Sequence, residues 1–251
     1  MIKYGLKLWT NNKDLFTEAV LLYKKGIVDF IELYHNPGSA DEMEHFDSLQ
    51  EVPVEIHHTH TSGFHEFMIG PEQLKIWEGT RRLADYLGAQ KIIVHPGQNH
   101  TFESFFHELE RIDDPRILIE NMAGLDTNEQ PMYAQTLEQL KQIAAVKPIC
   151  FDFEKAAKAA VYQGLDYKTF VADCLDALKP TYFHISGGDI SHAVDEHTNL
   201  WESRIDAAWV RSELNNRFIQ SDAQLVFETP KQDGLSNDVK NMQFFKEALN
   251  T

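Results

Sequence analysis

Six short apolar runs of the chain each end in a residue that can bind a metal ion. These residues are histidines, aspartates and glutamates, namely His58, His95, Glu120, Asp152, His184 and Glu228. Imidazole and carboxylate groups without thiolates suit zinc, manganese or iron(II). Buried carboxylates are costly when they have no partner, so their convergence requires neutralising cations or protons. The sequence therefore predicts a divalent-metal centre.

Each of these residues also has a purely structural interpretation. His95 would be a hydrogen-bonded core histidine, Asp152 would cap the helix that follows it, and Glu120 and Glu228 would form ion pairs. The lysines available for those pairs are Lys155 and Lys231. The structural interpretation needs a separate reason at each position, whereas one metal centre accounts for all six. We therefore favour the metal centre.

Strand parity bears on the choice among three clustered histidines, His57, His58 and His60. Side chains alternate between the two faces of a strand. If Val54 and Ile56 point to the interior of the fold, His58 follows them. His57 then points toward the helices, and His60 lies in the loop, where it would either reach the site or face solvent. Parity predicts His58 as the site residue.

The loop after the seventh apolar run carries a second metal-binding pattern. Asp195 and His197 stand two residues apart. In an extended segment their side chains share one face and can bind the same cation. A solvated loop is the alternative, but the position directly after His184 favours the metal-binding interpretation.

The elements that must position these residues follow an alternating pattern. Short apolar runs alternate with longer amphipathic runs, which is typical of βα units with a parallel sheet. The predicted strands span residues 4–9, 28–34, 52–58, 91–95, 116–121, 148–153, 181–185 and 224–229. Eight strands, each followed by a helix, predict an α/β fold of the (β/α)8 TIM barrel type. The active site of such a barrel lies at the carboxyl ends of its strands.

A doubly wound open sheet is the alternative fold. It would usually carry a glycine-rich phosphate loop after its first strand, and residues 9–12 contain no glycine. A chain of 251 residues has the size of one complete barrel. We therefore expect a single domain over residues 1–251.

The composition limits the partners that we expect. The chain has 39 acidic and 23 basic residues and a formal net charge of -16, which disfavours nucleic acid and anionic membranes. Its two cysteines, Cys150 and Cys174, indicate neither a disulfide framework nor a thiolate zinc site. There is no apolar stretch near the roughly 18 residues of a membrane span. We expect a cytoplasmic protein that acts on a small molecule.

The order of these residues resembles that in the xylose isomerase-like TIM barrel superfamily, which includes sugar phosphate isomerases and epimerases as well as endonuclease IV (AP endonuclease family 2). The resemblance covers nearly the whole chain. Its most specific parts are His95, Glu120-Asn121, Cys150-Phe151-Asp152, His184, Asp195-Glu196-His197 and Phe227-Glu228-Thr229-Pro230. The epimerase branch implies four metal ligands, Glu120, Asp152, His184 and Glu228. The endonuclease branch implies further ligands at His58, His95, Asp195 and His197.

One position departs from the pattern of this superfamily. A histidine commonly stands three residues after the strand-six aspartate, and here that residue is Lys155. An ammonium group is a poor metal ligand and repels cations, which argues against a three-metal cluster. We expect one or two divalent ions per chain, Mn²⁺ or Zn²⁺, with iron or cobalt also suitable. Lys155, His95 and His58 are the predicted substrate contacts.

The resemblance and the ligand types together favour one reaction class. We expect a sugar or sugar-phosphate isomerase or epimerase of carbohydrate metabolism, in which Glu120 and Glu228 move a proton next to a carbonyl. Hydrolysis of a phosphoester by paired metals is the main alternative, and Asp195 and His197 favour it. A multinuclear iron oxidase and a metal-bound binding module are further alternatives. Glu32 would contact substrate or pair with Lys7.

Overall fold

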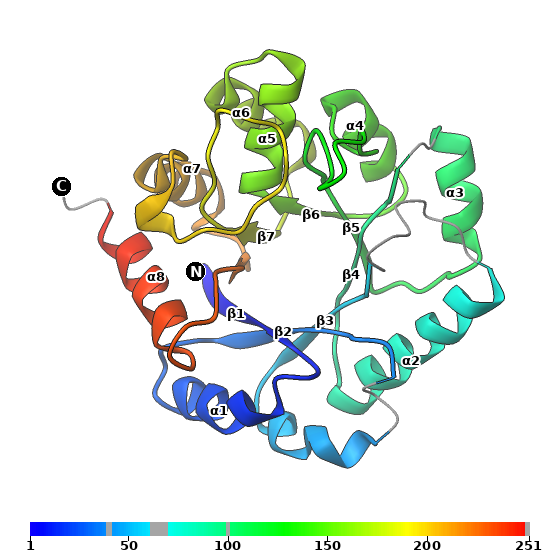
Figure 1. Cartoon of the computed structure of the whole chain (residues 1–251), viewed down its shortest axis with the longest axis vertical. Helices are drawn as coiled ribbons and strands as arrows, with labels where there is room; N and C mark the ends of the chain where they lie inside the picture. The colour runs from blue at the N-terminus through cyan, green and yellow to red at the C-terminus, as the bar shows by residue number, and fades with distance from the viewer. Residues whose placement is uncertain (39–41, 61–69, 99–100, 249–251) are drawn as a thin grey trace.

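The structure is a computed structural model that describes residues 1–38, 42–60, 70–98 and 101–248. Eight parallel strands form a closed barrel in the order β1 to β8 (Figure 1). The strands are β1 (Lys3–Trp9), β2 (Phe30–Tyr34), β3 (Val54–His57), β4 (Ile92–Val94), β5 (Ile117–Glu120), β6 (Ile149–Asp152), β7 (Tyr182–Ile185) and β8 (Gln224–Phe227). Each falls within one of the eight predicted strands or extends it by one residue. The predicted (β/α)8 TIM barrel is confirmed.

Helices surround the barrel on its outside (Figure 1). The α-helices are α1 (Phe16–Lys24), α2 (Pro71–Leu87), α3 (Phe102–Glu110), α4 (Leu137–Ala144), α5 (Phe153–Gln163), α6 (Tyr167–Leu178), α7 (Ala207–Phe218) and α8 (Ser236–Glu247). The 3-10 helices are η1 (Lys13–Leu15), η2 (Met43–Glu51) and η3 (Leu200–Glu202). Two departures from a strict alternation occur: η2 follows β2, and both α5 and α6 follow β6. No helix among the described residues is long and apolar enough to span a bilayer.

Local sequence signals explain where several helices begin and end. Thr101 and Thr136 form capping boxes at the starts of α3 and α4, in which the threonine side chain accepts from the backbone three residues later. Pro71 occupies the first turn of α2. Gly88 and Gly164 end α2 and α5 with positive φ, a conformation that glycine adopts without strain.

A layer of buried side chains fills the inside of the barrel. Its members are Phe30, Ile93, Leu118, Cys150, Tyr182 and Val226. On β1 the matching position is Gly5, where a Cβ would lie 2.5 Å from the Phe30 ring. Because side chains alternate along a strand, the residue two positions after each layer member also points inward. This layer therefore forms the floor beneath the candidate site.

Candidate active site at the barrel mouth

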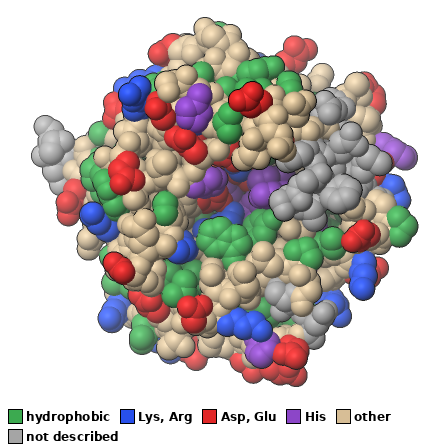
Figure 2. Space-filling model, viewed as in Figure 1, with side chains coloured by type: hydrophobic (Ala, Val, Ile, Leu, Met, Phe, Trp, Pro, Cys, Tyr) green, Lys and Arg blue, Asp and Glu red, His purple; other side chains and the backbone are tan. Residues whose placement is uncertain are grey.

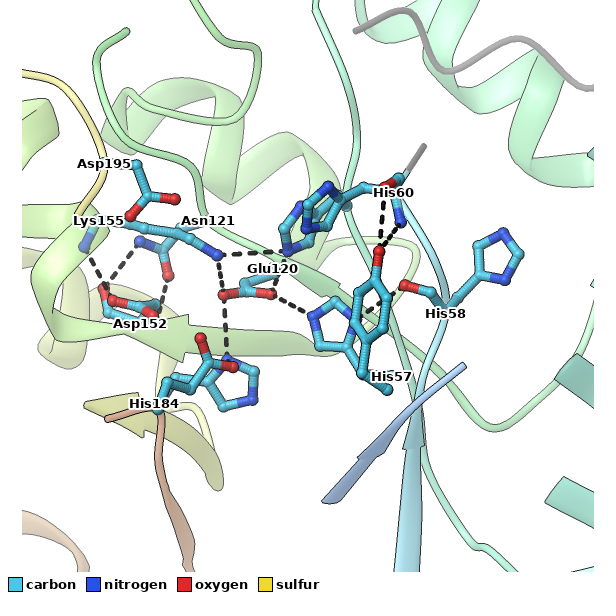
Figure 3. Close-up of polar contacts among 12 residues, drawn as sticks. His57, His58, His60, Glu120, Asn121, Asp152, Lys155, His184 and Asp195 are labelled. Atoms are coloured by element: carbon cyan, nitrogen blue, oxygen red, sulfur yellow. Dashed lines mark hydrogen bonds and ion pairs between the residues drawn. The ribbon is translucent and has the colours of Figure 1, made fainter. Parts of the chain in front are cut away.

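The side chains directly above this layer are polar and come from almost every strand. They are Lys7 of β1, Glu32 of β2, His95 just after β4, Glu120 of β5, Asp152 of β6, His184 of β7 and Glu228 just after β8. Six of these side chains are buried, and that of His95 is 11% exposed. Figure 3 shows Glu120 at the centre of this arrangement, with histidines on one side and Lys155 and Asp152 on the other.

Four overlapping sets of side chains among the described residues have ligand atoms close enough to hold a cation. Two of them are Glu32, His57, His184 and Glu228, and Glu120, Cys150 and His184. The other two are named here after one member each. The Asp152 group consists of Glu120, Asp152, His184 and Glu228, and the His95 group consists of His57, His95 and Glu120. Within each group the ligand atoms lie within 4.8 Å of one another. The two groups share Glu120. The four residues predicted as an epimerase-type ligand set are therefore brought together.

The parity prediction for His58 is wrong. Tyr34 and Ile93 are the strand neighbours of His57, and His57 Nε2 lies 3.1 Å from Glu120 Oε2, so His57 points inward. His58 Nδ1 instead lies 2.7 Å from the Thr80 hydroxyl on α2. The reason is that Val54 and Ile56 pack in the layer between strands and helices.

Two buried lysines reach into the centre. Lys155, in the first turn of α5, places its Nζ 2.5 Å from Glu120 Oε1 and 3.3 Å from His95 Nε2. Lys7 places its Nζ 2.7 Å from Glu32 Oε1 and also donates to Glu228. Lys7 and Lys155 are 4% and 2% exposed. Ammonium groups thus provide part of the neutralisation that the sequence analysis assigned to metal ions or protons.

The acids keep both lysines charged. Burial alone lowers the pKa of Lys7, but the carboxylates of Glu228 and Glu32 outweigh it and raise that pKa. Burial likewise lowers the pKa of Lys155, and Glu120 with the other acids raises it well above the ordinary value. The structural ion pair expected between Glu120 and Lys155 is present, and so is the pair of Glu32 with Lys7. Lys231, however, pairs with Asp238 rather than with Glu228.

His184 lies among three carboxylates. Its Nε2 is 2.8 Å from Glu32 Oε2, and its Nδ1 is 2.9 Å from Glu228 Oε1 and 3.1 Å from Glu120 Oε1. Burial lowers the pKa of His184, but Cys150 and the three carboxylates raise it well above the ordinary value. A protonated imidazole donates from both nitrogens, whereas a metal ligand must give up one of these protons. A cation bound at His184 therefore competes with that proton.

Asp152 combines a structural contact with an oxygen that has no partner. Its Oδ1 accepts from the backbone N–H of Lys155 at 2.8 Å and so caps α5, as the structural interpretation predicted. Its Oδ2 is buried and has no hydrogen-bond partner among the described residues. Burial raises the pKa of Asp152, to about 6, although Lys155 lowers it. This buried oxygen, beside two further carboxylates and an imidazole, fits one divalent cation in the Asp152 group.

Asp195 and His197 lie where the loop between β7 and α7 meets the centre. His197 Nε2 is 3.4 Å from Asp195 Oδ1, and His197 Nδ1 is 3.4 Å from Glu228 Oε2. Burial lowers the pKa of His197, but Asp195 outweighs it and raises that pKa to about 9. The loop thus brings both predicted side chains to the edge of the site, paired with each other.

A cavity of about 410 Å³ opens above the centre. It is lined by Lys7, Trp9, Tyr34, Asn36, His57, His60, His95, Lys155, Asp195, His197, Glu228, Thr229, Pro230 and Lys231. Figure 2 looks into this hollow, which histidine and basic side chains surround. The cavity has the size of a small-molecule site.

Several cavity residues were not assigned to the site from the sequence, although Lys7 was named as a possible partner of Glu32 and His60 as a loop histidine. Lys7 stands between Leu6 and Leu8 in a predicted strand, and a charge at that position is the signal that could have identified it. Tyr34 and Trp9 are aromatic residues at strand ends, and neither was predicted to contact the site. The ring of His60 stacks on that of His95 with centroids 4.5 Å apart, so this loop histidine reaches the cavity.

Comparison with known proteins supports the fold. No protein-family model matches the chain, and no curated protein matches it in sequence. Among solved structures, the chain is similar to endonuclease IV from Thermus thermophilus, at 22% identity and a TM-score of 0.71 with 99% of each chain covered. It is also similar to a xylose isomerase domain-containing protein from Salmonella typhimurium, at 14% identity and a TM-score of 0.65, covering 99% and 97% of the two chains.

An epimerase is also similar in structure. D-psicose 3-epimerase from Clostridium cellulolyticum, solved with D-tagatose, shares 10% identity and a TM-score of 0.57, with 99% of this chain and 97% of that chain covered. Identities this low speak for the fold alone. The predicted resemblance is thereby confirmed at that level: this chain has the fold that endonuclease IV shares with xylose isomerase-like proteins and sugar epimerases.

Proposed function

We propose that this chain is a divalent-metal-dependent isomerase or epimerase of a small sugar or sugar phosphate. The observation that carries the proposal is the position of Glu120 and Glu228. These carboxylates come from different strands, β5 and β8, and both lie within 3.1 Å of His184 Nδ1. A reaction that takes a proton from carbon and returns one elsewhere needs two such groups around one centre.

Each of the two glutamates has its own buried ammonium partner. Burial alone raises the pKa of Glu120, but Lys155 and His184 outweigh it and hold that pKa well below the ordinary value. Burial alone also raises the pKa of Glu228, but His184 and Lys7 outweigh it and hold that pKa well below the ordinary value. Both are therefore ionised at neutral pH, which is the form that a general base has before the reaction. Lys155 and Lys7 compensate the charge on either side of the centre.

The metal would be held by the Asp152 group. A divalent cation there supplies Lewis-acid polarisation of a substrate carbonyl. Lys155 and His95 line the cavity next to Glu120, and they would orient substrate oxygens by hydrogen bonding. His58 does not line the cavity, so His57 takes its place as the proposed substrate or metal contact from β3.

The cavity supports a small polar substrate. Its volume of about 410 Å³ lies near the lower end of the roughly 300–1,000 Å³ that ligand sites occupy. Three lysines among its lining residues, Lys7, Lys155 and Lys231, favour an anionic or hydroxyl-rich molecule. A sugar phosphate meets both conditions.

Hydrolysis of a small phosphoester is the second candidate. The placement of His197 beside Glu228, with Asp195 paired to it, favours this candidate, because both side chains would be available as further ligands next to the Asp152 group. The similarity to endonuclease IV supports the same alternative. The net charge of -16 disfavours a nucleic-acid duplex as the substrate.

Deuterium exchange tests the proposal. We expect the metal-loaded protein, incubated in D₂O with ketoses and ketose phosphates, to incorporate deuterium next to the carbonyl, as measured by NMR. Glu228→Gln should reduce this exchange by at least about 100-fold, the contribution of a general base. The control is Glu110→Gln, an exposed substitution on α3. Unchanged exchange in Glu228→Gln would contradict the proposed role of Glu228.

His197→Ala separates the two candidates. An isomerase that uses the Asp152 group should retain exchange within a few-fold. A hydrolase that needs His197 should lose cleavage of phosphoesters such as p-nitrophenyl phosphodiesters. Phosphoester cleavage by the wild-type protein that disappears in His197→Ala would replace the first candidate by the second.

A further inference from the structure

The Lys155 ammonium contacts the carboxylate of Glu120, which the Asp152 group and the His95 group share. Its Nζ is 2.5 Å from Glu120 Oε1 and 3.3 Å from His95 Nε2. Glu120 belongs to both groups, whereas His95 belongs only to the His95 group. The ammonium thus lies among atoms that a cation in the His95 group would need (Figure 3).

The local chemistry fits an ammonium group at this position. Lys155 is 2% exposed, and its helix α5 starts directly after Asp152, which caps it. An ammonium group has three donors and no acceptor, so it can satisfy Glu120 but cannot ligate a metal. A divalent cation at the same carboxylate would meet its positive charge at close range in a site of low dielectric.

Charge balance leads to the same result. The centre holds four carboxylates, those of Glu32, Glu120, Asp152 and Glu228, and two ammonium groups, those of Lys7 and Lys155. These groups together carry two negative charges in excess, which one divalent cation beside a neutral His184 balances. A second one would leave two positive charges in excess, because Asp195 at the cavity edge is already paired with His197.

We propose that Lys155 occupies the place of a second metal ion, so that this centre binds one divalent cation per chain, in the Asp152 group. The His95 group then serves the substrate rather than a metal. This inference rests on the metal centre of the proposed function and concerns its capacity, which the choice of substrate does not affect.

Metal stoichiometry tests the inference without any measurement of turnover. Protein freed of metal by chelator is dialysed against Zn²⁺ or Co²⁺, and bound metal is measured by inductively coupled plasma mass spectrometry, with Co²⁺ absorption as a second readout. We expect one ion in the wild type and two in Lys155→Ala. In the wild type the second ion should bind at least about 100-fold more weakly because of the like charge.

Lys158→Ala is the matched control. Lys158 lies one turn further along α5 and is fully buried, but its Nζ contacts Glu154, Glu196 and the carbonyl of Asp189 rather than either cation group. We expect it to keep one ion. Lys155→Gln, which keeps a hydrogen-bond donor on a side chain one atom shorter and removes the charge, provides a second variant if Lys155→Ala unfolds. Circular dichroism checks that both variants fold.

Several outcomes would overturn the inference. These are two ions or none in the wild type, one ion in folded Lys155→Ala and Lys155→Gln, or two ions in Lys158→Ala. Because the readout is bound metal, an absence of isomerase activity leaves the stoichiometry unaffected. Failure of the proposed function is therefore distinguishable from failure of this inference.

Discussion

Replacing Lys7 by methionine should destabilise the metal-free protein strongly. Lys7 Nζ lies between Glu32 and Glu228, and the side chains of these three residues are 5%, 0% and 6% exposed. Removing one partner of a buried pair leaves an uncompensated buried charge and costs about 3–5 kcal/mol. Such a loss is a large part of the roughly 5–15 kcal/mol by which domains are stable. Urea unfolding in the presence of a chelator measures the change.

An exposed pair of the same residue types provides the control. Lys24 lies 2.5 Å from Glu51, but the two side chains are 54% and 56% exposed. Water screens such a pair, and Lys24→Met should change the unfolding free energy by less than about 1 kcal/mol. The double variant Lys7→Met with Glu32→Gln should recover part of the loss, because it removes one of the two stranded charges.

Two results would refute this reasoning. The first is a Lys7→Met variant no less stable than Lys24→Met, which would mean that Lys7 does not act as the counter-charge of the centre. The second is a double variant that loses the sum of the two single losses, because the two side chains would then be independent. Either result would also contradict the charge balance from which we infer one metal ion per chain.

Two further predictions concern histidines. Asp195 raises the pKa of His197 from its ordinary 6.5 to about 9 in the folded protein. The protonated His197 therefore stabilises the fold fully below pH 6.5, and this stabilisation is lost as the pH rises toward 9. Between pH 6.5 and 9, the melting temperature of the chelator-treated protein should fall less in His197→Gln than in the wild type. An equal fall in the two proteins would contradict the raised pKa of His197. His57→Asn should weaken substrate binding, because His57 points into the centre. His58→Asn should cost about 1 kcal/mol of stability through its Thr80 hydrogen bond and leave substrate binding unchanged. Titration calorimetry and urea unfolding test this pair, and reversed effects would restore the parity prediction.

The sequence was sufficient to predict the barrel because apolar runs mark strands of a parallel sheet. The same property explains the error at His58. Both faces of a parallel barrel strand are buried, so hydrophobic residues such as Val54 and Ile56 do not reveal which face is the interior. The reliable signal in β3 is Glu55, a charged residue in a buried strand, which shares its face with His57.

The role of Lys7 depends on topology that local sequence does not contain. Its partner Glu228 lies 221 positions away, and the two meet because β8 closes the barrel against β1. Lys155 was recognised as a departure from the expected ligand pattern, and its pairing with Glu120 was one of the two alternatives. The other alternative was a contact with substrate. Sequence could not choose between them, because a few ångströms decide whether the ammonium group touches the carboxylate or a substrate.

The number of metal ions also bears on the choice between the two candidate functions. Hydrolysis by paired metals requires two cations that share a carboxylate, and Glu120 is the residue that would bridge them. Lys155 already takes one oxygen of that carboxylate, and His57 and His95 approach the other at 3.1 Å and 2.8 Å. A single bound ion would leave the paired-metal route without its second cation, while the isomerase route needs one ion and two glutamates. A count of two in the wild type would instead favour phosphoester hydrolysis, and His197→Ala would then be the variant to study first.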